Sequence, residues 1–274
     1  MNYGTFFAEV IGATQNKEVE CAEVAMEMLA SAGIMGTDVH AENFRTYGVE
    51  PIKKLHDNAG MRVTSVFHIL HGDYKNPAEV KTLIAGSELD IENCAKAGSK
   101  LLMGVPLISV PHTCPQDRVD TLKGIAEYLG GISEIAEQYG VTVTVENYSE
   151  TDTALSYISD IEYILENAPK VRYVFDSGNF WFGGDDMLKA CKKFADKTVH
   201  VHLKDLKERK GGELNICGKE VDCVAIGDGI LPNYEAIEFL KSTGYDGAYI
   251  IEVTHTPGMS RVFKSLENLK NNIK

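Results

Sequence analysis

Four polar residues of types that commonly bind metals each stand at the end of a short run rich in β-branched and aromatic residues. They are Glu146, Asp176, His202 and Glu252. Side chains alternate between the two faces of a strand, and this parity makes each of the four the last inward-pointing residue of its run. Three carboxylates gathered in one place would repel one another unless a cation lay between them. The four residues are therefore predicted to hold one divalent metal ion.

The donor set consists of three carboxylates and one imidazole. Such an oxygen-rich set suits Mn²⁺, Mg²⁺ or Co²⁺, and it leaves zinc possible. For any one of these residues alone, a solvated polar group at the rim or a helix cap would be the simpler interpretation. The shared strand position and shared face of all four favour the metal site.

The elements that must position these residues are short β-like runs that alternate with longer segments of helical periodicity. This alternation is typical of a parallel α/β fold, and eight such pairs predict a (β/α)8 TIM barrel, a single domain over residues 1–274. Barrel enzymes carry their sites at the C-terminal ends of the strands, where the four residues lie. The expected strands are 4–9, 34–39, 62–68, 100–105, 141–146, 171–176, 198–203 and 248–253.

Two helices and one insertion complete the predicted barrel. Apolar residues recur at three- and four-residue intervals over 116–139, which predicts an outer helix. The last helix is expected to start with Thr256 as N-cap and Pro257 at its first position. The polar segment at about 205–231, after the seventh strand, is predicted to be a long loop over the barrel mouth.

Composition narrows the class of protein. With 274 residues and 44% hydrophobic content, the chain can build one large core. It shows neither a signal peptide nor an apolar run long enough for a membrane span, so we expect a cytoplasmic location. The six cysteines contain no Cys-x-x-Cys pair, which argues against a zinc ribbon or a disulfide framework. The formal charge of −13 makes nucleic acid an unfavourable partner.

The sequence around the four residues resembles the xylose isomerase-like TIM-barrel superfamily, in particular its sugar phosphate isomerase and epimerase branch. The resemblance implies one divalent metal, usually manganese, magnesium or a similar ion, on Glu146, Asp176, His202 and Glu252. It also implies that the two glutamates act as acid and base, so that a proton is abstracted through a metal-stabilised enediolate. The matching stretches are 143–147, 175–180, 200–205, 227–229 and 244–252.

Two departures separate the chain from the ketose 3-epimerases of that family. Many of them carry a histidine three residues after the aspartate, and here that position is Asn179. They also place an arginine six residues beyond the metal histidine, where this chain has Glu208. An amide can orient a hydroxyl group but cannot titrate. The departures favour a looser relative over a standard ketose 3-epimerase.

Further residues are predicted near the mouth from strand parity or from their position beside the four. Lys204 is a catalytic candidate that would stabilise an enediolate, with a salt-bridged rim lysine as the alternative. For the aromatic candidates, core packing is the competing interpretation. The predicted substrate contacts are His68, Asn179, Trp181, Asp38 and Phe7.

The leading functional hypothesis is a metal-dependent isomerase or epimerase of a sugar or sugar phosphate. A lyase or dehydratase acting on a keto-inositol or keto-sugar would begin with the same proton abstraction. A non-catalytic sugar-binding protein is the third alternative. The related type IV apurinic endonucleases need further histidines that this chain lacks. The expected partner is a small carbohydrate, without nucleic acid or membrane, and the resemblance also allows a homo-oligomer.

Overall fold

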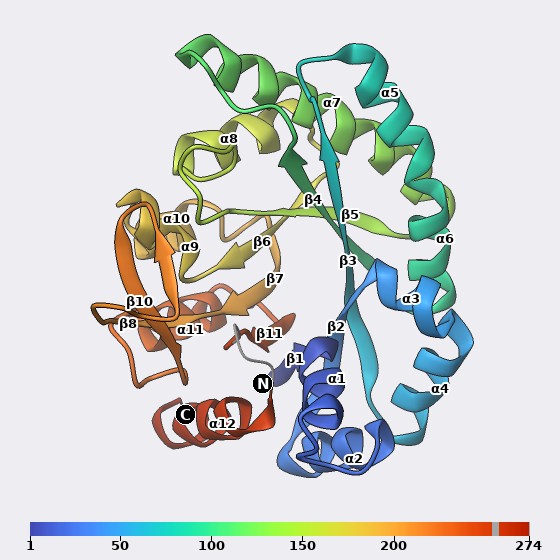
Figure 1. Cartoon of the computed structure of the whole chain (residues 1–274), viewed down its shortest axis with the longest axis vertical. Coiled ribbons are helices and arrows are strands. Elements are labelled where there is room, and N and C mark those ends of the chain that lie inside the picture. The colour runs from blue at the N-terminus through green and yellow to red at the C-terminus, as the bar shows by residue number, and fades with distance from the viewer. Residues whose placement is uncertain (254–257, 274) are drawn as a thin grey trace.

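A closed barrel of eight parallel strands forms the centre of the molecule. The computed structural model describes residues 1–253 and 258–273. Neighbouring strands follow the order β1-β11-β7-β6-β5-β4-β3-β2 around the barrel (Figure 1). The barrel strands are β1 (Asn2–Phe6), β2 (Ile34–His40), β3 (Arg62–Gly72), β4 (Leu101–Ile108), β5 (Thr142–Glu146), β6 (Arg172–Asp176), β7 (Thr198–Leu203) and β11 (Ala248–Ile251).

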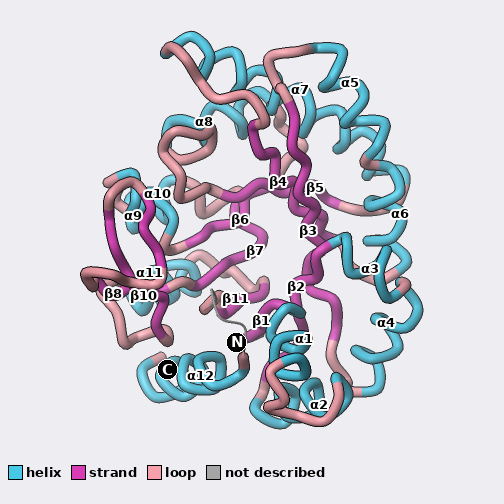
Figure 2. The backbone as a smooth tube through the Cα atoms, in the orientation of Figure 1, coloured by secondary structure: helices cyan, strands magenta, loops and turns pink. Residues whose placement is uncertain are grey.

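Helices surround the barrel on its outside, as the cyan segments around the magenta strands show (Figure 2). The strand–helix alternation and the closed barrel confirm the predicted TIM-barrel fold. The helices are α1 (Phe7–Gln15), α2 (Ala22–Ala32), α3 (Ala41–Tyr47), α4 (Val49–Asn58), α5 (Pro77–Gly86), α6 (Glu88–Lys96), α7 (Pro115–Gln138), α8 (Ile158–Asn167), α9 (Asn179–Gly183), α10 (Met187–Lys193), α11 (Asn233–Ser242) and α12 (Met259–Asn272).

The main core lies between the barrel and the helices. Outward-facing strand residues such as Val143 and Val201 pack there with α7 residues such as Ile125 and Leu129, all fully buried. Each such side chain contributes roughly 1.5–3 kcal/mol by leaving water. Among the described residues, none of the helices has the length and apolar character needed to cross a membrane.

The predicted element bounds differ from the structure mainly at the chain ends. The helix expected at 116–139 is α7, and its prediction is confirmed. The first strand ends at Phe6 instead of residue 9, because helix α1 begins at Phe7. The predicted start of the last helix, Thr256 and Pro257, lies outside the described residues.

The segment expected to be a long loop at about 205–231 contains a small antiparallel sheet, so that expectation is wrong. The order of its strands is β8-β10-β9, and it lies beside α9 and α10 (Figure 1). Alternation along β10 puts Val221 and Cys223 on one face, where they pack with Leu206 and Phe182 in a second buried cluster. The strands are β8 (Asp205–Glu208), β9 (Leu214–Ile216) and β10 (Lys219–Val224).

Candidate metal centre and active site

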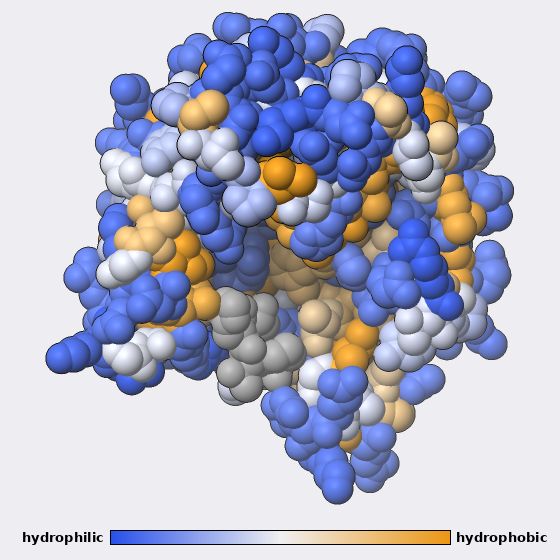
Figure 3. Space-filling model, turned by 45° about the horizontal axis from the view of Figure 1, so that its top comes forward, coloured by the Kyte–Doolittle hydropathy of each residue, from blue (hydrophilic) through white to orange (hydrophobic). Residues whose placement is uncertain are grey.

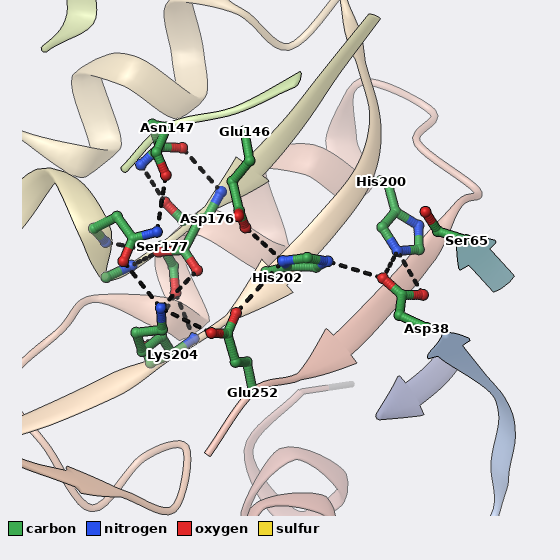
Figure 4. A network of polar contacts seen from close by, with 12 residues as sticks. Asp38, Ser65, Glu146, Asn147, Asp176, Ser177, His200, His202, Lys204 and Glu252 are labelled. Atoms are coloured by element: carbon green, nitrogen blue, oxygen red, sulfur yellow. Dashed lines mark hydrogen bonds and ion pairs between the residues drawn. The ribbon is translucent and has the colours of Figure 1, made fainter. Parts of the chain in front are cut away.

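The four residues predicted from strand parity come together at the C-terminal ends of β5, β6, β7 and β11. One ligand atom from each of Glu146, Asp176, His202 and Glu252 lies within 4.8 Å of the others (Figure 4). The Nδ1 atom of His202 lies 2.5 Å from Glu146 Oε1 and 3.4 Å from Glu252 Oε2. Glu252 is the most accessible, with 22% of its side chain exposed. The cluster is thus buried but open on the Glu252 side.

The hydrogen bonds of Asp176 show that this cluster fits a metal ion. Its Oδ1 atom accepts the backbone N–H groups of Gly178 at 2.8 Å and Asn179 at 2.6 Å. Its buried Oδ2 atom lies 3.4 Å from the Lys204 ammonium but has no hydrogen-bond partner among the described residues. A buried carboxylate oxygen without such a partner is costly, and a cation ligated by it would remove that cost. Three carboxylates and an imidazole make a suitable donor set for a divalent ion.

Asp38 sets the orientation of His202. The Nε2 atom of His202 lies 2.9 Å from Asp38 Oδ2, and the Nε2 atom of His200 lies 2.8 Å from the same oxygen (Figure 4). Thr64 donates its hydroxyl to Asp38 Oδ1 at 2.6 Å. Burial raises the pKa of Asp38, but the two histidines outweigh this and hold it below its usual range. The carboxylate therefore accepts a hydrogen bond from the Nε2–H group of His202, and the Nδ1 atom of the same ring faces the cluster.

This contact corrects the prediction that Asp38 binds substrate. Asp38 is 1% exposed and its oxygens are occupied by the two histidines and Thr64. It lies behind His202 as seen from the cluster. The sequence placed Asp38 correctly at a strand end, but nothing in it showed that β2 and β7 face each other across the barrel.

Lys204 brings a positive charge to the other side of the cluster. Its Nζ atom lies 3.0 Å from Glu252 Oε1 and 3.4 Å from Asp176 Oδ2, and it donates to Asn179 Oδ1 at 2.9 Å. Burial lowers the pKa of Lys204, but Asp176 and Glu252 outweigh this and raise it above its usual value. The side chain is therefore an ammonium group that points at the predicted reaction centre.

Asn179 holds Lys204 in place. Its Nδ2 donates to the carbonyl oxygen of Asn147 at 2.8 Å while its Oδ1 accepts from Lys204. Asn179 is 6% exposed, so both halves of its amide are used by the protein. The structure thus replaces the predicted substrate contact with a contact that positions Lys204.

Asn147 is a positioning residue that the sequence did not reveal. Its Oδ1 accepts the Tyr173 hydroxyl at 2.5 Å and the backbone N–H of Asp176 at 3.2 Å. Its Nδ2 donates to the carbonyl oxygen of Asp176 at 3.2 Å. Asn147 follows Glu146 directly, so these bonds connect the end of β5 to β6 and set the spacing of Glu146 and Asp176. Its place directly after a predicted ligand, within the matching stretch 143–147, was the available signal.

The charges of the cluster influence one another. Burial raises the pKa of Glu252, but Lys204 and His202 outweigh this and hold it below its usual range. Burial raises the pKa of Asp176, and Lys204 only partly offsets the increase. Burial lowers the pKa of His202, but Glu146 and the hydrogen bonds to Asp38 and Glu146 raise it well above its ordinary value. A metal ion on Nδ1 must therefore displace a proton.

His68 lies outside the barrel, so its predicted inward orientation is wrong. Its Nε2 lies 2.7 Å from the Tyr128 hydroxyl on α7, and its Nδ1 lies 3.4 Å from Asp90 on α6. The pairing of β2 with β3 skips Thr64, which indicates a bulge. One extra residue exchanges the two faces of the strand beyond it, so Phe67 points inward and His68 points to the helices.

The two aromatic candidates pack against other parts of the protein. Phe7 is the first residue of α1, is 4% exposed, and packs in the main core with its ring 5.7 Å from that of His56. Trp181 packs on the small sheet, where the Lys219 ammonium lies 4.1 Å from its ring centre. Core packing, the alternative interpretation for both residues, agrees with these positions.

Phe6 and Phe67 form the aromatic contact at the cluster that the sequence reasoning missed. The Phe6 ring lies 5.1 Å from that of His202 and 5.6 Å from that of Phe67. Both phenylalanines are half-buried. Phe6 is the last residue of β1, one position before the predicted Phe7, because the strand ends there.

The comparison with family models agrees with this fold. The model described as xylose isomerase-like TIM barrel matches residues 19–272, and the chain belongs to this family.

Among curated proteins, the chain is similar to bacterial inosose dehydratases. It is 25% identical over 172 residues to "Inosose dehydratase 1" of a Bacillus cereus strain, covering 60% of this chain and 56% of that protein. It is 22% identical over 263 residues to "Inosose dehydratase" of Clostridium perfringens (strain 13 / Type A), covering 87% and 84%. The chain thus matches little more than half the length of the first of these relatives.

Solved structures share the fold at lower identity. A sugar phosphate isomerase/epimerase from Parabacteroides distasonis ATCC 8503 superimposes with a TM-score of 0.75 at 16% identity, covering 98% of this chain and 95% of that one. The IOLI protein with a bound zinc atom also gives 0.75 at 16% identity, covering 99% and 96%. These likenesses support the fold alone.

Proposed function

We propose that the protein is a divalent-metal-dependent isomerase or epimerase of a sugar or sugar phosphate. The observation that carries the proposal is the meeting of Glu146 and Glu252 at His202 Nδ1. Their strands, β5 and β11, are separated in the barrel by β6 and β7, so the carboxylates approach from different sides. Two carboxylates on different sides of one site can remove and return a proton at a sugar carbon.

The residues of the cluster have separate roles in this proposal. Glu146, Asp176, His202 and Glu252 would hold the metal ion. When bound, the ion would supply Lewis-acid polarisation of a carbonyl and its neighbouring hydroxyl. One glutamate removes the proton from the carbon beside the carbonyl, and the other returns a proton to another carbon or face. Lys204 places its ammonium where it stabilises the negative charge that develops on oxygen.

The proposed ion is manganese. Three carboxylates and an imidazole are a hard to borderline donor set, which suits Mn²⁺ and also admits Mg²⁺, Co²⁺ or Zn²⁺. The similar fold of the IOLI protein carries a zinc atom, which keeps zinc as the main competitor. We also propose a cytoplasmic location and a homo-oligomeric state, as the family resemblance allows.

A second candidate is a dehydratase acting on a keto-inositol or keto-sugar. The observation in its favour is that the curated relatives are inosose dehydratases. The first proton abstraction would be the same. The carbon–oxygen bond at the next carbon would then break as a double bond forms, and the leaving hydroxyl would depart as water after taking a proton from an acid such as Glu146 or Glu252. The product would be lighter by one water, whereas an isomerase leaves the mass unchanged.

The test is exchange of substrate C–H protons for deuterium, followed by NMR over ketoses, aldoses, their phosphates and keto-inositols with Mn²⁺. Wild type should exchange one position in at least one compound, and mass spectrometry of that product separates isomerisation from elimination. Glu146→Gln and Glu252→Gln should each slow exchange by about 100-fold or more, since general acid–base catalysis contributes about that much. The exposed Glu137→Gln serves as control. The proposal would be refuted if neither wild type nor Glu137→Gln exchanged a proton of any compound. It would also be refuted if Glu146→Gln and Glu252→Gln exchanged as fast as wild type.

A further inference from the structure

The barrel mouth has an apolar side that faces the metal cluster. We call it the apolar wall and define it as Phe6, Phe67, Ile69 and Val105. Phe6 ends β1, Phe67 and Ile69 lie on β3, and Val105 lies on β4. The cluster comes from β5, β6, β7 and β11, so the charged residues and the wall lie on different halves of the barrel. His40, the last residue of β2, borders the wall with its ring 4.9 Å from that of Phe67.

The side chains of the wall face the inside of the barrel, because residues adjacent to them in sequence face the outer helices. A Cβ atom added to Gly104 would lie 2.8 Å from Leu129 of α7, so position 104 faces outward and Val105 faces inward. On β3, His68 contacts the outer helices, whereas Phe67 contacts Phe6. Ile69 shares the face of Phe67 and pairs with Val105 in the parallel register.

The wall exposes apolar side chains, which is unfavourable in water unless a ligand or another chain covers them. Ile69 is 39% exposed, and the other three residues are half-buried. Figure 3 shows a hollow on this face, beside the grey residues, whose interior is coloured largely as hydrophobic. Exposed apolar surface costs about 25 cal/mol per Å². Concave apolar surface beside a few convergent polar groups is the usual composition of a ligand site.

We propose that the substrate is a sugar derivative that carries an apolar, aromatic substituent, such as an aryl glycoside of a keto sugar. This inference rests on the proposed function, because the reacting sugar ring would lie at the cluster and its substituent against the apolar wall. Phe6 joins the two parts, since its ring lies 5.1 Å from His202 and 5.6 Å from Phe67. Aromatic rings favour edge-to-face or offset contacts with such a pair.

The test compares matched phenyl and methyl β-glycosides of glucose, galactose and xylose, with dissociation constants measured by calorimetry on the full chain with Mn²⁺. For at least one sugar, the phenyl glycoside should bind about tenfold more tightly, or about 1.4 kcal/mol. Ile69→Ser should reduce that preference about threefold or more, and Ile69→Val should retain it. Leu89→Ser removes an exposed side chain of equal size on α6 and should leave the preference unchanged.

The outcomes separate this inference from the proposed function. Equal binding of phenyl and methyl glycosides, including no binding of either, would overturn the substrate class even if C–H exchange is observed with simple sugars. A phenyl preference without exchange would overturn the proposed function alone. Sedimentation of wild type and Ile69→Ser examines a second copy as occupant: a dimer that the substitution dissociates would assign the wall to a contact between copies and refute the inference.

Discussion

At the residue scale, the site depends on which nitrogen of His202 faces the cluster. Asp38 accepts a hydrogen bond from His202 Nε2, and hydrogen bonds from His200 and Thr64 hold Asp38 in place. Asp38, His200 and His202 are at most 1% exposed, so solvent does not compete for the hydrogen bonds between them. Nδ1 therefore points toward Glu146 and Glu252 before any ligand arrives, and little entropy is lost in preparing the site.

Replacing Asp38 should weaken metal binding without removing a ligand. Asp38→Asn keeps the size of the side chain but loses the charge that draws the Nε2 proton of His202. Loss of such a partner costs about 10- to 100-fold in metal affinity. Calorimetric titration with Mn²⁺ measures the change, with Asp57→Asn on the surface of α4 as control. An affinity within about twofold of wild type would contradict this role of Asp38.

Strand parity predicted the grouping of the four cluster residues because β5, β6, β7 and β11 are regular at their C-terminal ends. The same argument failed for His68, because the bulge at Thr64 exchanges the faces of β3. A bulge depends on pairing with a neighbouring strand and has no simple pattern in one sequence. Asn147 was missed for a related reason, since its partners Tyr173 and Asp176 lie on another strand.

At the scale of elements, the alternation of strands and helices was sufficient to predict the barrel. The strands are short runs rich in β-branched and aromatic residues, and α7 shows a clear helical period over its length. The small sheet was missed because its strands are short and polar on their outer faces, as in β9 (Leu214–Ile216). Its buried cluster also depends on Phe182, which comes from α9 outside the sheet.

Two glycines of helix α7 should respond in opposite ways to replacement by alanine. An added Cβ at Gly124 would collide with the backbone carbonyl oxygen of Tyr74, whereas an added Cβ at Gly130 meets nothing within 4 Å. Gly124→Ala should lower the free energy of unfolding by about 1–3 kcal/mol through overpacking. Gly130→Ala should raise it by about 0.5–1 kcal/mol through helix propensity. Chemical denaturation measures both, and equal effects would show that α7 does not approach Tyr74 this closely.

At the scale of the whole molecule, metal binding and folding are linked. The chain carries a formal charge of −13, and three of its carboxylates converge in one buried cluster. An ion that binds only the folded state stabilises it by about 2.7 kcal/mol at 100 times its dissociation constant. The ligand set exists only when β5, β6, β7 and β11 are assembled, so the unfolded chain cannot match this affinity.

Saturating Mn²⁺ should therefore raise the melting temperature by about 5–10 °C for a chain of this size, and EDTA should reverse the shift. The pKa of His202 lies well above its ordinary value, so a proton competes for Nδ1 and the shift should grow as pH rises from about 6 to about 8. Asp176→Asn keeps an oxygen to accept the N–H groups of Gly178 and Asn179 but removes a charged ligand. Thermal scans of this variant should show a much smaller Mn²⁺ shift. A shift as large as that of wild type would mean that the ion binds elsewhere, and no shift in wild type would mean that the cluster does not bind Mn²⁺.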